Sequence, residues 1–138
     1  MAWYNFYDNF LPFEVSVVSP LADNARNYYR YVAESTFSAE NGQKVYKIKV
    51  QPKYPATATA EGYIYLIDKT GEIYATDLSI KGSTIKQPLL NVLDIRQNFG
   101  YNTEEKLWSK NTQVVSFDLS LAGIHAVGTY SFVYSNYN

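Results

Sequence analysis

Short stretches of alternating apolar and polar residues, separated by turn signals, fill most of the chain between Gln43 and Tyr137. Successive side chains of a β-strand point to opposite faces, so a period of two is typical of strands that bury one face. The turns are short, and short turns join strands that run antiparallel. The sequence therefore predicts an antiparallel sheet, and almost none of the usual catalytic motifs lies within it.

Turn signals locate three hairpins. Asn41-Gly42 offers the positive φ that a tight hairpin needs, and Lys69-Thr70-Gly71 and Ala122-Gly123 mark the other two. The predicted strands are 29–38, 43–51, 62–68, 72–81, 89–99, 111–121 and 124–134. Alternation makes one side of the sheet consistently apolar, and Gly128 inside the last strand indicates a bulge or a strong bend. We therefore expect the sheet to be curled.

One short helix is expected at residues 20–28. Ser19 is a favourable N-cap, Pro20 suits the first helical position, and Asp23 lies near the positive end of the helix dipole. The predicted fold class is α+β, mainly β: a curled antiparallel sheet of about seven strands, or half-barrel, wrapped on one short helix. Residues 1–18 form an aromatic N-terminal arm in this prediction, and residues 19–138 form a single curled antiparallel-sheet domain.

Charge and cysteine content limit the classes of partner. The formal net charge is −1 and only 18% of residues are charged, which is not the footprint of a protein that binds nucleic acid. Cysteine is absent, so disulfides and thiolate metal sites are excluded. No stretch reaches the ~18 apolar residues that a membrane helix needs. Residues 1–18 also lack the basic start and apolar core of a signal peptide.

The aromatic content is high, with 14 Tyr, 7 Phe and 2 Trp. Each aromatic side chain can bury about 150–250 Å², and a small domain has limited interior. Tyrosine is favoured in strands, so one interpretation is that these rings only fill the sheet. The other is that several of them form a binding surface, because ordinary monomers expose few large apolar patches.

The sequence contains few residues in recognisable catalytic motifs. His125 is the single histidine, no Gly-x-Ser-x-Gly motif is present, and His125 is interpreted as a surface or hydrogen-bonded structural residue. Asp77, Asp94 and Asp118 lie on separate predicted strands and could converge as an acid–base pair. Cross-strand ion pairs with Arg96 are the simpler account. We predict no catalytic residues, no metal site and no cofactor.

Several segments together resemble a known family. In order along the chain, they are 7–9 (YDN), 19–25 (SPLADNA), 28–31 (YYRY), 46–53 (YKIKVQPK), 62–68 (GYIYLID), 94–99 (DIRQNF) and 134–137 (YSNY). The order resembles the middle region of an uncharacterised outer-membrane family of Gram-negative bacteria. Its members carry an N-terminal carboxypeptidase-regulatory-like domain and end in a membrane β-barrel. The resemblance implies a location at the periplasmic face of the outer membrane, neighbouring domains in a longer chain, and no catalytic residues.

The strand pattern is also similar, more loosely, to the half-barrels of lipoprotein carriers. In those proteins an antiparallel sheet curls around helices and holds acyl chains on its apolar face. The shared feature is a Lys-Pro turn ahead of a Gly-Tyr-Ile-Tyr strand. This chain departs from the carriers because only one short helix is expected where the carriers have several.

The leading hypothesis is a non-enzymatic periplasmic module whose apolar concave face binds a lipid-like ligand, such as an acyl chain, or a partner segment. The residues expected near such a ligand are Ile64, Leu93, Ile95, Phe117, Leu119 and Phe132. One alternative is a purely structural domain that connects a neighbouring domain to a membrane β-barrel. Another is a hydrolase that uses the carboxylates of Asp77, Asp94 and Asp118. No nucleic-acid partner is expected, and the sequence leaves the oligomeric state open.

Overall fold

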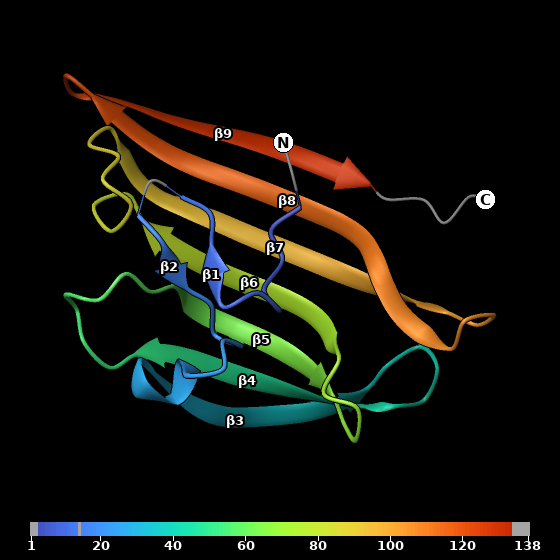
Figure 1. Ribbon diagram of the computed structural model, residues 1–138. Coiled ribbons are helices and arrows are strands. Elements are labelled where there is room, and N and C mark those ends of the chain that lie inside the picture. The colour runs from blue at the N-terminus through green and yellow to red at the C-terminus, as the bar shows by residue number, and fades with distance from the viewer. Residues whose placement is uncertain (1–2, 14, 134–138) are drawn as a thin grey trace.

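The computed structural model describes residues 3–13 and 15–133. Its main feature is an open sheet of seven antiparallel strands in the order β3-β4-β5-β6-β7-β8-β9, so each strand pairs with the next along the chain (Figure 1). The strands are β3 (Tyr29–Ser38), β4 (Lys44–Pro52), β5 (Glu61–Ile67), β6 (Ile73–Lys81), β7 (Leu90–Asn102), β8 (Leu107–Leu121) and β9 (Ile124–Val133). The antiparallel sheet is therefore confirmed; Tyr134, in the last predicted strand, lies outside the described residues.

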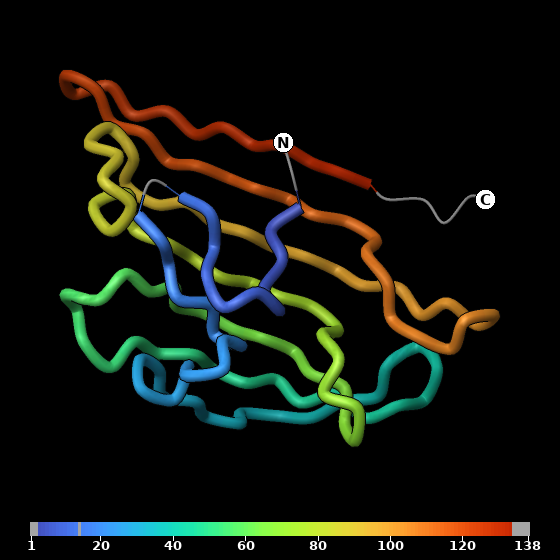
Figure 2. Tube along the Cα trace, in the orientation of Figure 1, coloured from blue at the N-terminus to red at the C-terminus, as the bar shows by residue number. Residues whose placement is uncertain are grey.

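The N-terminal part of the chain lies across one face of this sheet. We call residues 3–13 and 15–28 the arm, and the sheet face beneath it the arm face. The arm contains β1 (Phe10–Leu11) and β2 (Val17–Val18), which pair antiparallel as a second, two-stranded sheet. Figure 2 shows its trace, in blue, crossing in front of the middle strands of the sheet.

The main hydrophobic core lies between the arm and the sheet. Phe6, Leu11 and Val17 from the arm are buried in one cluster with side chains such as Leu78 and Ile95 from the sheet. A strand pair such as β1–β2 has little stability alone, so burial of its apolar residues on the larger sheet accounts for its order. The arm is thus a structural layer of the fold.

Two tyrosines of β3 attach the arm by hydrogen bonds. The hydroxyl of Tyr29 donates to the carbonyl of Val18 and accepts from the N–H of Ala60 at 2.9 Å. Tyr31 donates to the carbonyl of Pro20 at 2.6 Å. Burial raises the pKa of Tyr29 and raises that of Tyr31 to about 12, so both hydroxyls keep their protons and remain donors.

Two buried glutamines hold the start of the arm. Gln97 on β7 donates to the carbonyl of Tyr4 at 2.6 Å, and Gln113 on β8 accepts from the N–H of Tyr4 at 3.0 Å. The two amides also bond each other at 2.9 Å, and Thr76 donates to Gln97 at 3.2 Å. Buried polar groups cost little only when they are paired. This network therefore fixes where the arm begins its path over the sheet.

The predicted fold class is wrong, because the described residues contain no α-helix. Residues 20–28 hold only a 3₁₀ turn, η1 (Ala25–Asn27), and the sheet is an open one covered by an extended arm instead of a sheet wrapped on a helix. Ser19 does accept a bond from the N–H of Leu21, as an N-cap would. However, the N–H of Asp23 donates to Asn9, outside the segment. A nine-residue helix is marginal alone, and the segment instead forms turns closed by bonds three residues apart, such as that from the N–H of Ala25 to the carbonyl of Ala22.

A second hydrophobic cluster lies on the opposite face, which we call the outer face. Val45 and Ile67 are three residues from Ile48 and Ile64 of the first cluster, so they point the other way. Trp108 packs with them, and its indole N–H donates to Gln43 at 3.0 Å. The half-buried residues against this cluster are Tyr65, Tyr74, Phe99 and Tyr101. β5 is therefore covered on both faces.

Candidate functional site

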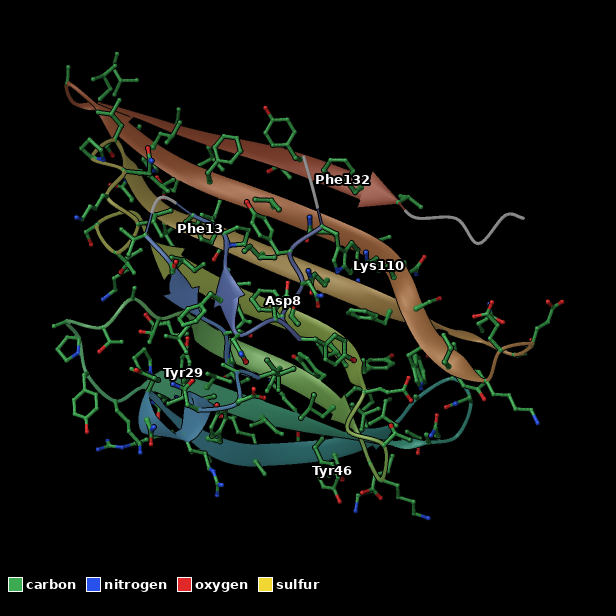
Figure 3. The ribbon with its side chains drawn as sticks, in the orientation of Figure 1. Asp8, Phe13, Tyr29, Tyr46, Lys110 and Phe132 are labelled. Atoms are coloured by element: carbon green, nitrogen blue, oxygen red, sulfur yellow. The ribbon has the colours of Figure 1, made fainter. Side chains whose placement is uncertain are left out.

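The six residues predicted near a ligand fall into two groups. Ile64, Leu93 and Ile95 are buried in the core cluster beneath the arm. Phe117, Leu119 and Phe132 lie farther along the same face, on β8 and β9, and are only half-buried. Figure 3 shows Phe132 on β9, well away from the labelled arm residues Asp8 and Phe13. Whether any of the six contacts a ligand stays a prediction.

The second group belongs to a larger apolar surface, which we call the uncovered strip. Register places Phe117 opposite Gly128, Leu119 opposite Ala126 and Leu121 opposite Ile124, all on the arm face. The strip comprises Phe117, Leu119, Leu121, Ile124, Tyr130 and Phe132. Leu121 is 59% exposed, Ile124 is 70% exposed and Tyr130 is 53% exposed. The described residues of the arm lie mainly over the middle strands and reach β8 beside Gln113, away from the β8–β9 turn (Figure 1).

Gly128 has a packing role in the strip. β9 pairs with β8 over ten residues without a register shift, so the bulge expected at Gly128 is absent from this described pairing. Instead, the ring of Phe117 occupies the space that a side chain at Gly128 would fill: a β-carbon there would lie 2.2 Å from Cε2 of Phe117. Phe117 also packs against Tyr130, with ring centroids 5.6 Å apart. The two rings form the aromatic part of the strip.

Alternation places Leu121, Ile124 and Tyr130 on the apolar face, but it does not show that they are exposed. Their exposure depends on two facts of tertiary structure. β9 is the edge strand of the sheet, and the described part of the arm covers the middle strands and reaches β8 only near its Gln113 end, not near the β8–β9 turn. The one available signal was the position of β9 as the last strand of a meander, where an edge is expected.

The three aspartates of the hydrolase hypothesis each have a surface partner on the outer face. Asp77 lies 3.8 Å from Arg96 across the strands, and both side chains are at least half exposed. Asp94 accepts a hydrogen bond from Ser79. Asp118 accepts from Asn91 at 3.1 Å and contacts His125, which is exposed. Among the described residues, no group of three or more His, Cys, Asp or Glu could hold a metal ion.

The pKa of Asp118 gives a measurable check of this surface. The hydrogen bond from Asn91 is the largest single cause that holds this pKa below its ordinary value, and a hydrogen bond and the charge of His125 lower it further. A lowered carboxyl pKa stabilises the fold above the unfolded value of about 3.9, and the contribution is lost as the pH falls through the folded value. We expect Asn91→Ala and His125→Ala each to raise the pKa of Asp118. Carboxyl chemical shifts followed by NMR through an acid titration measure both, and an unchanged pKa in the Asn91 variant would contradict the assignment.

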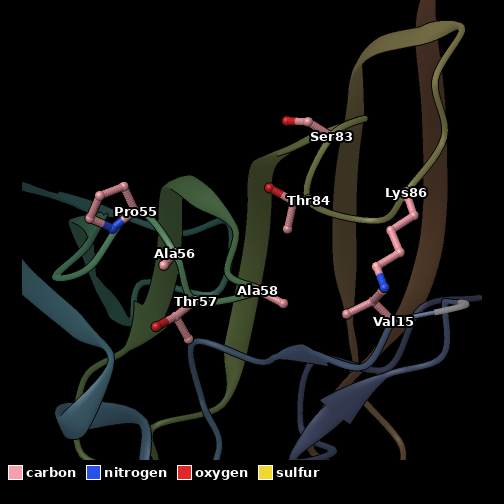
Figure 4. A pocket seen from close by; sticks show the side chains of 8 residues that line it. All are labelled: Val15, Pro55, Ala56, Thr57, Ala58, Ser83, Thr84 and Lys86. Atoms are coloured by element: carbon pink, nitrogen blue, oxygen red, sulfur yellow. The ribbon is translucent and has the colours of Figure 1, made fainter.

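Two hollows lie at the margins of the arm. One, of about 310 Å³, is lined by Val15, by residues 55–58 and by Ser83, Thr84 and Lys86 (Figure 4). Among the described residues, its lining offers hydroxyls and one ammonium but no carboxylate to pair with the ammonium. The other, of about 330 Å³, lies between residues 20–26 and strands β3 to β5, and Ile64 is among its apolar lining residues. This second hollow continues the apolar character of the arm face.

In the part of the chain that the structure describes, no helix is long and apolar enough to cross a membrane.

These observations define a class of protein: an all-β module in which an extended arm covers the middle of an open antiparallel meander and leaves an apolar strip at one end. The chain belongs to a family of unknown function, DUF5686, whose model matches residues 1–137. No curated protein and no solved structure matches the chain.

Proposed function

We propose that this chain is a non-enzymatic module at the periplasmic face of the outer membrane, and that its uncovered strip binds the acyl chain of a lipid-like ligand. The membrane location follows from the resemblance of its segments to an outer-membrane family. The strip supports the binding role, because it is the part of the apolar face that the arm leaves accessible.

The chemistry of the strip favours an apolar ligand. All six residues of the strip are aromatic or aliphatic, and the Tyr130 hydroxyl is its one polar side-chain group. Such a surface gains free energy from removing apolar area from water, and it has little to recognise a charged or strongly polar molecule. The strip lies on the same face as the apolar hollow beside residues 20–26, so both apolar regions face one side of the sheet.

The alternative of a purely structural connecting domain rests on a separate observation. The arm fills the middle of the apolar face: Phe6, Leu11 and Val17 are almost completely buried against the sheet. A domain whose face is filled by its own chain needs no ligand for stability. In this alternative the strip packs against a neighbouring domain of a longer polypeptide.

Two substitutions in the strip test the binding role. Replacing Ile124 and Tyr130 by serine removes apolar surface that is already largely exposed, so the fold is expected to remain intact. Burying one such side chain contributes about 1.5–3 kcal/mol, so the double variant is expected to weaken the binding of a fluorescent fatty acid by at least about tenfold. Fluorescence titration measures the affinity, and native mass spectrometry detects co-purified lipid.

The matched control is the double variant Val127→Ser and Val133→Ser. These residues are also exposed and lie on the same strand, but they point to the outer face. We expect the control to keep wild-type affinity. Absence of fatty-acid binding and of co-purified lipid in the wild-type chain would reject the ligand role and favour the connecting domain.

A further inference from the structure

The two edges of the seven-stranded sheet differ in how they are protected from pairing with other chains. Edge strands expose unpaired N–H and C=O groups, and natural proteins protect them with charges, prolines or bulges. β3, one edge, carries Arg30 and Glu34 and has a register shift between Ala33 and Ser35. The β3 edge is therefore protected against pairing with another chain.

β9, the opposite edge, has none of them among residues 124–133. It contains no Asp, Glu, Lys, Arg or Pro, and all ten of its residues pair with β8 in continuous register. Its histidine, His125, already contacts Asp118 on the neighbouring strand. β9 therefore presents a long, regular and uncharged row of backbone donors and acceptors on the side away from β8.

We propose that β9 pairs antiparallel with β9 of a second copy of this chain, joining the two sheets edge to edge. This inference does not depend on the ligand proposal, because it concerns the backbone edge of β9 and not the apolar side chains of the strip. An acyl chain has no hydrogen-bonding groups and cannot satisfy that edge, whereas an extended strand can.

The side chains of β9 are self-complementary about Thr129. A two-fold axis at Thr129 places Tyr130 opposite Gly128 of the second copy and Phe132 opposite Ala126 of the second copy. Each large ring on the arm face then meets a small residue, which is a favourable arrangement for cross-strand packing. On the outer face Val127 meets Ser131 of the second copy, and no charged residue faces another.

The surroundings of β9 leave room for this pairing. The described residues of the arm cross the middle of the sheet and do not lie over β9, and the β3 edge with η1 is at the far side (Figure 1). Strand addition would also set the uncovered strips of the two copies side by side on one face. The joined sheet would then carry a continuous apolar surface about twice as wide as one strip.

Charge placed at the two-fold axis tests the proposal. The wild-type chain is expected to sediment at about twice its mass of 15.7 kDa as its concentration rises. Thr129→Lys sets two ammonium groups against each other and is expected to weaken association at least about tenfold, as is Thr129→Glu. An equimolar mixture of the two variants is expected to recover the dimer, because opposite charges then meet. Sedimentation equilibrium measures each mass.

The matched control is Thr36→Lys, the same substitution at an exposed position on the β3 edge, which is expected to associate like the wild type. Circular dichroism verifies that each variant is folded. A wild-type chain that stays at the mass of one copy, or a Thr129→Lys variant that still dimerises, would overturn the proposal. Dissociation that the mixture does not reverse would reject the axis at Thr129.

A cross-linking measurement covers the case in which charge at Thr129 disturbs folding. The chain has no cysteine, so Thr129→Cys introduces a single thiol. Residues opposite each other in an antiparallel pair have Cα atoms about 4.5–5.5 Å apart, within the range that a disulfide bridges. Thr129→Cys is expected to give a disulfide-linked dimer under mild oxidation, and Thr36→Cys is not. Equal cross-linking of both variants would contradict pairing through β9.

Discussion

Phe6→Ala is expected to lower the free energy of unfolding by about 3–5 kcal/mol, the range for deleting a buried aromatic side chain. Phe6 is 1% exposed and belongs to the core cluster between the arm and the sheet. Its backbone carbonyl also accepts a hydrogen bond from the hydroxyl of Ser19, which links the two halves of the arm. Urea denaturation followed by circular dichroism measures the loss.

Phe10→Ala is the matched control, because Phe10 lies in the same arm but is 54% exposed. We expect its free energy of unfolding to stay within about 0.5 kcal/mol of the wild type. A domain of this size has a total stability of only about 5–15 kcal/mol, so the Phe6 variant would be close to its unfolding threshold. Similar effects of the two substitutions would show that the arm does not pack as described.

Gly62→Ala is the second substitution with a large expected effect, a loss of about 4 kcal/mol or failure to fold. Gly62 is the second residue of β5 and has a φ of +139°, a conformation that L-residues rarely adopt. A β-carbon there would lie 2.2 Å from the backbone carbonyl oxygen of Asp77 on β6. Because the clash is with backbone, no side-chain rotation relieves it. Thermal and urea unfolding measure the loss.

Gly71→Ala separates the cost of placing alanine at a positive φ from the cost of the steric clash. Gly71, in the β5–β6 turn, also has positive φ, +73°, but a β-carbon there meets nothing within 4 Å. Its substitution carries only the conformational cost, about 1–2 kcal/mol. We therefore expect Gly62→Ala to be clearly the more damaging change. Equal losses would mean that β5 and β6 can separate locally to accept the methyl group.

The strands were predictable because their signals are local. Asn41-Gly42 supplies the positive φ of the β3–β4 turn, where Gly42 has φ of +85°, and the predicted strand 29–38 coincides with β3. The helix prediction at 20–28 failed for a non-local reason. Asn9, which is nearby in space, accepts from the N–H of Asp23, and Phe6 accepts from the hydroxyl of Ser19 just before the segment. The local pattern of residues 20–28 does not contain that information.

The candidate site was predictable only in part. Alternation correctly placed residues such as Phe117 and Phe132 on the face that also carries Ile64. It gave no indication of which part of that face the arm covers, because residues 3–13 have no period that fixes their path. That path is set by the two glutamines that hold Tyr4, and each lies more than ninety positions away along the chain.

Those same glutamines have a consequence for biosynthesis. A ribosome makes the chain from its N-terminus, so Tyr4 and Phe6 emerge long before Gln97 and Gln113 exist. Until the sheet has been synthesised, the apolar residues of the arm lack the surface against which they pack. Contacts between distant parts of a polypeptide are the slowest to form and leave nascent chains vulnerable to aggregation. The arm is translated before the sheet on which it packs, and is thus among the last segments of this domain to find its native partners.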